Sequence, residues 1–70
     1  MTLDQYFAEE PHGAKAEMAR YLGITDVWLS LLISGKRRPS AVLAVRIEEA
    51  TGGLVQRAEL REDLFAPRAE

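Results

Sequence analysis

The segment Ala14–Ser34 most constrains the fold, because a glycine within it separates two stretches whose apolar residues recur at helical spacing. The inward positions are Met18, Ala19 and Leu22 in the first stretch and Leu29, Leu32 and Ile33 in the second. Gly23 can take the left-handed conformation that ends a helix without a Cβ clash. The sequence therefore predicts a helix over about Ala14–Leu22, a three-residue break, and a second helix that opens with the N-cap Thr25 and ends at Gly35.

The spacing inside this segment is that of a helix-turn-helix. Counted from the small residue Ala19, the turn glycine follows after four residues, and apolar residues follow after five, ten and thirteen. Two helices that cross steeply over so short a turn need a small side chain at Ala19 and a glycine at Gly23. An αα-corner with no DNA function shows much of the same pattern, so the motif alone leaves that alternative open.

Three more short helices are expected around this motif. Thr2 and Gln5 have the spacing of a capping box, which predicts a helix over about Leu3–Glu9 that buries aromatic surface. Pro39 precedes a helix over Ser40–Ala50, whose inward positions are Leu43, Ile47 and Ala50. A last helix over about Ala58–Leu64 is expected to pack back onto the body through Leu60, Leu64 and Phe65.

The predicted fold class is therefore all-α, a compact bundle of about five short helices that contains a helix-turn-helix. Seventy residues are enough for one small domain, which we place at residues 1–66, with residues 67–70 as a frayed tail.

The net charge of −2 hides an uneven distribution. Residues 15–46 carry six lysines and arginines against two acids, whereas both ends of the chain are acidic. Lys36, Arg37 and Arg38 directly follow the second helix of the motif, where they would reach a phosphate backbone, and Lys15 is a fourth candidate for phosphate contact. A run of three bases is by itself usually only a solvated loop. Arg46 either adds a further phosphate contact or pairs with Glu49.

Several classes of function are not expected. The chain has no cysteine and one isolated histidine, His12, which we interpret as a plain loop residue. We expect no metal site, no catalytic residues, no cofactor, no small-molecule ligand and hence no enzyme activity. No apolar run approaches the length of a membrane span, and the acidic N-terminus does not resemble a signal peptide, so the cytoplasm is the expected compartment.

Three stretches of the chain, GAKAEMARYLGIT, SGKRRPS and RIEEATGG followed by QRAELREDLF, resemble the small helical Cro-like phage repressors and their YdaS-type prophage relatives, which have a lambda-repressor-like fold. The resemblance covers about residues 13–66. It implies a transcription regulator that binds a double-stranded DNA operator as a homodimer and usually represses a promoter. It also implies that bases are read from the start and outward face of the second motif helix, here Thr25, Asp26, Val27, Ser30, Leu31 and Ser34.

This reading face is more apolar than is common in the family. Ser30 is its central hydrogen-bonding side chain, Val27 and Leu31 suit thymine methyl groups, and Asp26 either accepts from a cytosine amino group or only stabilises the helix start. Trp28 has two interpretations, a half-buried core residue or an exposed contact with DNA or with a protein partner.

Two functions from different classes therefore remain open at the sequence level. The first is sequence-specific DNA binding. The second is a protein-interaction adaptor or antitoxin-like module, which would use an apolar surface around Trp28 and Leu31.

Overall fold

The structure, a computed structural model, describes residues 1–11 and 13–65. The expectations for His12 and for the tail 67–70 lie outside these residues. The helices, in chain order, are α1 (Leu3–Ala8), α2 (Ala14–Leu22), α3 (Asp26–Ile33), α4 (Ala41–Ala50) and α5 (Arg57–Leu60). The described residues contain no strand, and the prediction of an all-α fold with about five helices is confirmed.

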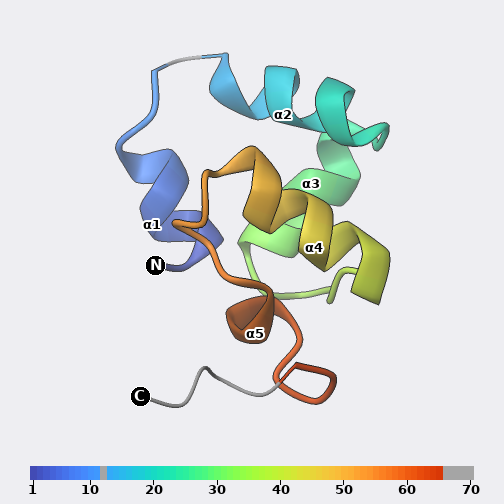
Figure 1. Cartoon of the computed structure of the whole chain (residues 1–70). Coiled ribbons are helices and arrows are strands. Elements are labelled where there is room, and N and C mark those ends of the chain that lie inside the picture. The colour runs from blue at the N-terminus through green and yellow to red at the C-terminus, as the bar shows by residue number, and fades with distance from the viewer. Residues whose placement is uncertain (12, 66–70) are drawn as a thin grey trace.

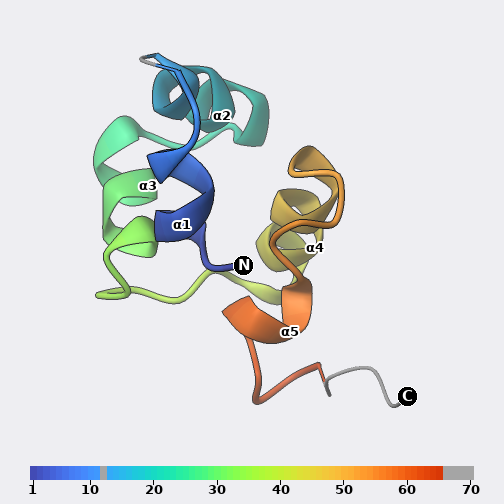
Figure 2. The same ribbon diagram turned by 90° about the vertical axis from the view of Figure 1, so that its left-hand side faces the viewer.

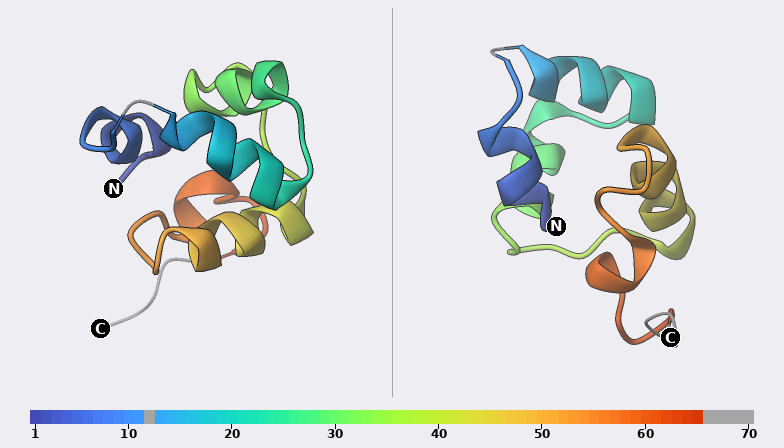
Figure 3. Two further views of the ribbon diagram at one scale, coloured as in Figure 1. Left: turned by 90° about the horizontal axis from the view of Figure 1, so that it is seen from above. Right: turned by 60° about the vertical axis from the view of Figure 1, so that its left-hand side comes forward.

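The helices form two sides with α2 laid across one end of both (Figure 1). In Figure 2, α1 and α3 lie on one side and α4 lies on the other, and the view from above in Figure 3 shows the same separation. Helix α2 contacts both α3 and α4, α1 contacts α3, and α5 contacts α4. This arrangement leaves the far side of α3 uncovered by other helices.

One hydrophobic core fills the space between the two sides. It consists of Leu3, Phe7, Met18, Ala19, Leu22, Leu29, Leu32, Ile47 and Val55. Five of the six inward positions predicted for the helix-turn-helix are at most 8% exposed, namely Met18, Ala19, Leu22, Leu29 and Leu32. Ile33, Leu43 and Ala50 pack against this core at partial burial. The periodicity of the sequence therefore identified the inner faces of α2, α3 and α4.

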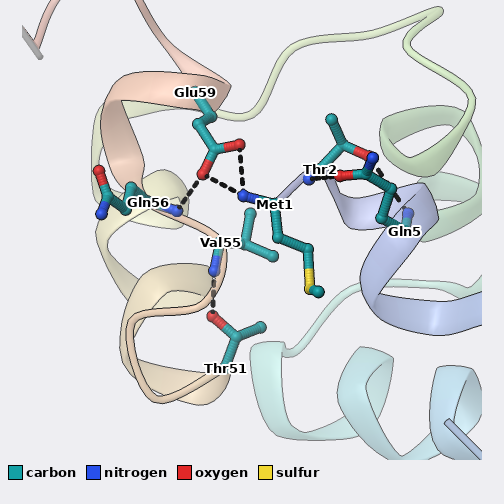
Figure 4. Close-up of polar contacts among 7 residues, drawn as sticks. All are labelled: Met1, Thr2, Gln5, Thr51, Val55, Gln56 and Glu59. Carbon is teal, nitrogen blue, oxygen red and sulfur yellow. Dashed lines mark hydrogen bonds and ion pairs between the residues drawn. The ribbon is translucent and has the colours of Figure 1, made fainter. Parts of the chain in front are cut away.

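The predicted capping box starts α1. The Thr2 hydroxyl accepts a hydrogen bond from the backbone amide of Gln5 at 3.1 Å, and the side-chain oxygen of Gln5 accepts one from the backbone amide of Thr2 at 2.9 Å (Figure 4). Beside it, the ammonium group of Met1 lies 2.9 Å from the Glu59 carboxylate on α5. The same carboxylate accepts from the Gln56 amide at 3.0 Å, so one side chain caps α5 and holds the start of the chain against it.

Thr51 and Val55 are core residues that the sequence did not single out. Val55 is fully buried and Thr51 is 5% exposed, although both lie in the break after α4. The Thr51 hydroxyl donates to the Ile47 carbonyl at 3.0 Å. The same hydroxyl accepts from the Val55 backbone amide at 3.1 Å (Figure 4). This buried hydroxyl satisfies the backbone where the chain turns from α4 toward α5, and it thereby allows Val55 to enter the core.

The last helix is shorter than predicted. It ends at Leu60 rather than Leu64, because Arg61 leaves the helical region with φ −138° and ψ 75°. The Arg61 guanidinium binds the Asp63 carboxylate, and residues two apart cannot face each other on a helix. Leu60 packs against the core as expected, but the expected packing of Leu64 is wrong, since 51% of it is exposed. Phe65 lies half-buried, with the Arg57 guanidinium 5.6 Å from its ring centre.

Candidate nucleic-acid interface

The corner between α2 and α3 is fixed by backbone hydrogen bonds. Gly23 has φ +75°, its amide donates to the Arg20 carbonyl at 3.2 Å, and the Ile24 amide donates to the Ala19 carbonyl at 3.0 Å. These are the two bonds of a Schellman motif, which requires a left-handed residue at its centre. The Thr25 hydroxyl then accepts from the Trp28 amide at 3.0 Å and starts α3. The predicted left-handed conformation of Gly23 and the predicted N-cap Thr25 are both confirmed.

The outward face of α3 carries most of the predicted base-reading residues. Five of these six residues are exposed, namely Thr25, Asp26, Val27, Ser30 and Ser34. Val27 is 71% exposed. The Thr25 hydroxyl already serves as a cap, and the Ser34 hydroxyl donates to the Leu31 carbonyl at 3.1 Å. Ser30, Val27 and Asp26 therefore have the side chains best placed to contact another molecule.

Trp28 and Leu31 are less exposed than the other residues of this face. Both are half-buried, and Trp28 packs against the core. This placement matches the first interpretation of Trp28 and reduces the apolar surface on which a protein-interaction module would depend. The remaining outer part of each side chain lies beside the exposed residues of α3.

The basic run Lys36–Arg38 lies in the turn after α3, which we call the basic turn. Lys36, Arg37 and Arg38 are all exposed, and Lys15 is exposed near the start of α2. The Leu31 carbonyl accepts from the Lys36 amide at 3.0 Å and from the Arg37 amide at 3.3 Å. Gly35 reverses the chain here with φ +80°. Because the end of α3 holds the backbone of Lys36 and Arg37 in this way, hydrogen bonds fix this part of the basic turn to the helix.

Arg46 has a role within the fold that the sequence did not indicate. Its guanidinium donates to the Tyr21 carbonyl at 2.9 Å and to the Leu22 carbonyl at 3.2 Å, and it lies 5.7 Å from the centre of the Tyr21 ring. A cation at the C-terminus of a helix is favoured by the unpaired carbonyl groups there. Arg46 therefore fastens α4 to the end of α2, and the expected pair with Glu49 is not among the ion pairs of residues 1–11 and 13–65.

An acidic residue near the basic turn is the main feature that the sequence did not indicate. The Asp63 carboxylate receives the Arg61 guanidinium through two bonds, of 2.9 and 2.7 Å, and lies 3.4 Å from the Arg38 guanidinium. The hydrogen bonds from Arg61 lower the pKa of Asp63 from 3.8 to about 2, and the charges of Arg61 and Arg38 act in the same direction. No short-range sequence pattern places Asp63 beside Arg38, 25 residues away.

A metal site and a membrane span are not evident in the described part of the chain. No group of three or more His, Cys, Asp or Glu residues among residues 1–11 and 13–65 is arranged to hold a metal ion. Over the same residues, every helix is too short or too polar to cross a lipid bilayer.

Comparison with known proteins gives two matches. The sequence model of a family described as bacterial toxin YdaS matches residues 7–69. A prophage transcriptional regulatory protein of Escherichia coli (strain K12) is 33% identical over 51 residues, which make up 73% of this chain and 77% of the relative. The matched range contains all of α2, α3 and α4 together with the basic turn.

Proposed function

Because the chain belongs to the bacterial toxin YdaS family, and because a relative is named a prophage transcriptional regulatory protein, we propose that it is a transcriptional regulator that binds double-stranded DNA. In this proposal the outward face of α3 enters the major groove and the basic turn contacts the phosphate backbone on the groove edge. The observation that carries the proposal is the rigid connection between the two parts, in which the Leu31 carbonyl holds the backbone of Lys36 and Arg37.

The proposed contacts divide into two kinds. Thr25, Asp26, Val27, Ser30, Leu31 and Ser34 face the bases, and Lys15, Lys36, Arg37 and Arg38 face the phosphates. Ser30 can donate to or accept from several bases, and the exposed Val27 suits a thymine methyl group. Phosphate contacts supply affinity without sequence preference, whereas base contacts supply specificity. Because the outward face of α3 carries few polar groups, we expect few direct hydrogen bonds to bases and a modest sequence preference.

We further propose that two protomers bind one operator, with half-sites spaced by one DNA turn of about 34 Å. Val42, Leu54 and Leu64 are large apolar residues that are at least 51% exposed, and they are our candidates for the contact between protomers. Val45 is a weaker candidate because it is half-buried, and Val55 is no candidate because it lies in the core.

The alternative of a protein-interaction adaptor receives less support. It depends on an exposed apolar surface around Trp28 and Leu31, and both residues are half-buried. The exposed basic groups beside α3 have no role in such a module, whereas a DNA-binding protein uses them.

The salt dependence of DNA binding tests the proposal. We expect Arg37→Ala to weaken binding to all duplex sequences alike and to reduce the slope of log K against log salt by about 1, as the loss of one phosphate contact does. The matched control is Arg57→Ala, since Arg57 is already paired with Glu48 at 2.6 Å. Fluorescence anisotropy with a labelled 30-base-pair duplex at several salt concentrations measures both quantities.

Two results would contradict the proposal. One is binding by the wild-type protein that does not change between low and moderate salt. The other is an equal loss of affinity in Arg37→Ala and Arg57→Ala, which would mean that only net charge matters.

A further inference from the structure

Asp63 is fixed in position over the basic turn by a residue that cannot easily move. The Arg61 guanidinium donates to both oxygens of the Asp63 carboxylate, and its third bond, of 3.0 Å, goes to the carbonyl of the buried Pro39. Only 21% of the Arg61 side chain is exposed. Arg61 thus connects the turn after α5 to the backbone just before α4, and it holds the carboxylate at that place.

Arg38 is the mobile partner in this cluster. Its guanidinium reaches Asp63 through one contact of 3.4 Å, and 68% of its side chain is exposed. A long exposed side chain with a single loose ion pair exchanges partners readily, because such pairs contribute little to stability. Arg61, with three shorter bonds, does not have this freedom.

We propose that Asp63 lowers the affinity of this protein for DNA, because its fixed carboxylate competes with the DNA phosphates for Arg38. The inference rests on the proposed DNA binding and adds an acidic residue that sets its strength. When Arg38 turns to a phosphate, the Asp63 carboxylate loses a cation and stays close to the DNA backbone. Both effects oppose binding.

The ionisation state of Asp63 agrees with this role. Since the pKa of its carboxyl group lies at about 2, the side chain is negatively charged throughout the neutral range. The competition is therefore present whenever the protein is folded at neutral pH, and a change of pH around 7 does not relieve it.

The test is Asp63→Asn, which removes the charge and keeps the shape of the side chain. Because the variant raises the positive charge that faces the DNA backbone by about one, we expect binding at about 0.1 M salt to tighten about three- to tenfold, with a salt slope steeper by about 1. Glu62→Gln is the matched control. It changes the net charge equally at an exposed neighbouring residue for which no ion pair is found within residues 1–11 and 13–65.

A double-mutant cycle identifies Arg38 as the group that is released. When Arg38 is already replaced by alanine, we expect Asp63→Asn to raise the DNA affinity no more than the control Glu62→Gln does. Anisotropy with a labelled duplex of random sequence measures all the variants, and far-UV circular dichroism checks that each is folded. A gain that persists undiminished without Arg38 would overturn the proposal, as would weaker or unchanged binding by Asp63→Asn.

The outcome also separates this inference from the proposed function. If the wild-type protein binds DNA with a normal salt dependence and Asp63→Asn binds equally well, only the role of Asp63 is wrong. If neither the wild type nor Asp63→Asn binds duplex DNA, both proposals are overturned together.

Discussion

Replacement of Thr51 by valine should lower the free energy of unfolding, because one buried backbone amide loses its hydrogen-bond acceptor. Thr51→Val keeps a branched side chain of similar volume and exchanges the hydroxyl for a methyl group. The Ile47 carbonyl that receives this hydroxyl still accepts from the Thr51 amide at 3.0 Å. The Val55 amide, however, donates to the Thr51 hydroxyl in a fully buried position, and the substitution removes that acceptor.

The expected cost follows from this one unsatisfied donor. A buried amide without a partner costs about 1–3 kcal/mol. For a domain of this size, each kcal/mol corresponds to about 4–8 °C in melting temperature. Urea unfolding and thermal unfolding followed by circular dichroism measure the two quantities, and hydrogen exchange of the Val55 amide reports on the local effect.

Thr51→Ser is the matched control, because it keeps the hydroxyl and loses one methyl group, at a cost of about 0.8 kcal/mol. The Val55 amide should stay protected from exchange in Thr51→Ser and lose protection in Thr51→Val. If Thr51→Val is as stable as the wild type and its Val55 amide remains protected, the account of this turn is incorrect.

Two other substitutions test the corner and the acidic residue. Ala19→Val should cost about 1–3 kcal/mol more in unfolding free energy than Ala16→Val, because Ala19 is 1% exposed between packed helices and Ala16 is exposed on the same helix; equal losses in urea unfolding would refute the close packing. The pKa of Asp63 in the folded protein, about 2, lies below its ordinary value of 3.8, so its contribution to stability is complete above pH 3.8 and is lost as the pH falls through 2. Unfolding free energies measured from pH 6 to pH 2 should therefore fall more steeply for the wild type than for Asp63→Asn, and parallel curves would count against the pairing with Arg61.

Local sequence patterns predicted the parts of the fold that depend on nearby residues. The bounds of α2 match the expected ones, because Gly23 and the spacing of Met18 and Leu22 act within a few residues of each other. The caps at Thr2 and Thr25 are equally local, and each is present.

Features that depend on distant residues were not predictable in this way. The Arg46 side chain donates to the carbonyls of Tyr21 and Leu22, and these carbonyls come within its reach only because α2 and α4 pack together. The early end of α5 depends on the bond from Arg61 to the Pro39 carbonyl and on the pair with Asp63. Arginine and aspartate also occur on helix surfaces, so their identity alone gave no sign that the helix stops there.

The candidate interface shows the same division. The family resemblance implied the base-reading positions on the outer face of α3, and the run Lys36–Arg38 indicated the basic turn. The partial burial of Trp28 could not be predicted from the sequence alone. A residue at the edge of a helix face is buried only when a neighbouring element covers it, and the fold decides whether one does. The approach of Asp63 to Arg38 likewise needed the path of the chain after α5.

Selection of bound duplexes from random sequence tests the central claim, that α3 reads DNA, most directly. We expect the wild-type protein to enrich one motif with two half-sites about one helical turn apart, and Ser30→Ala to relax the preference at particular positions while keeping most of the affinity. Enrichment of no motif by the folded wild-type protein, or an unchanged motif for every substitution on the outer face of α3, would contradict the claim.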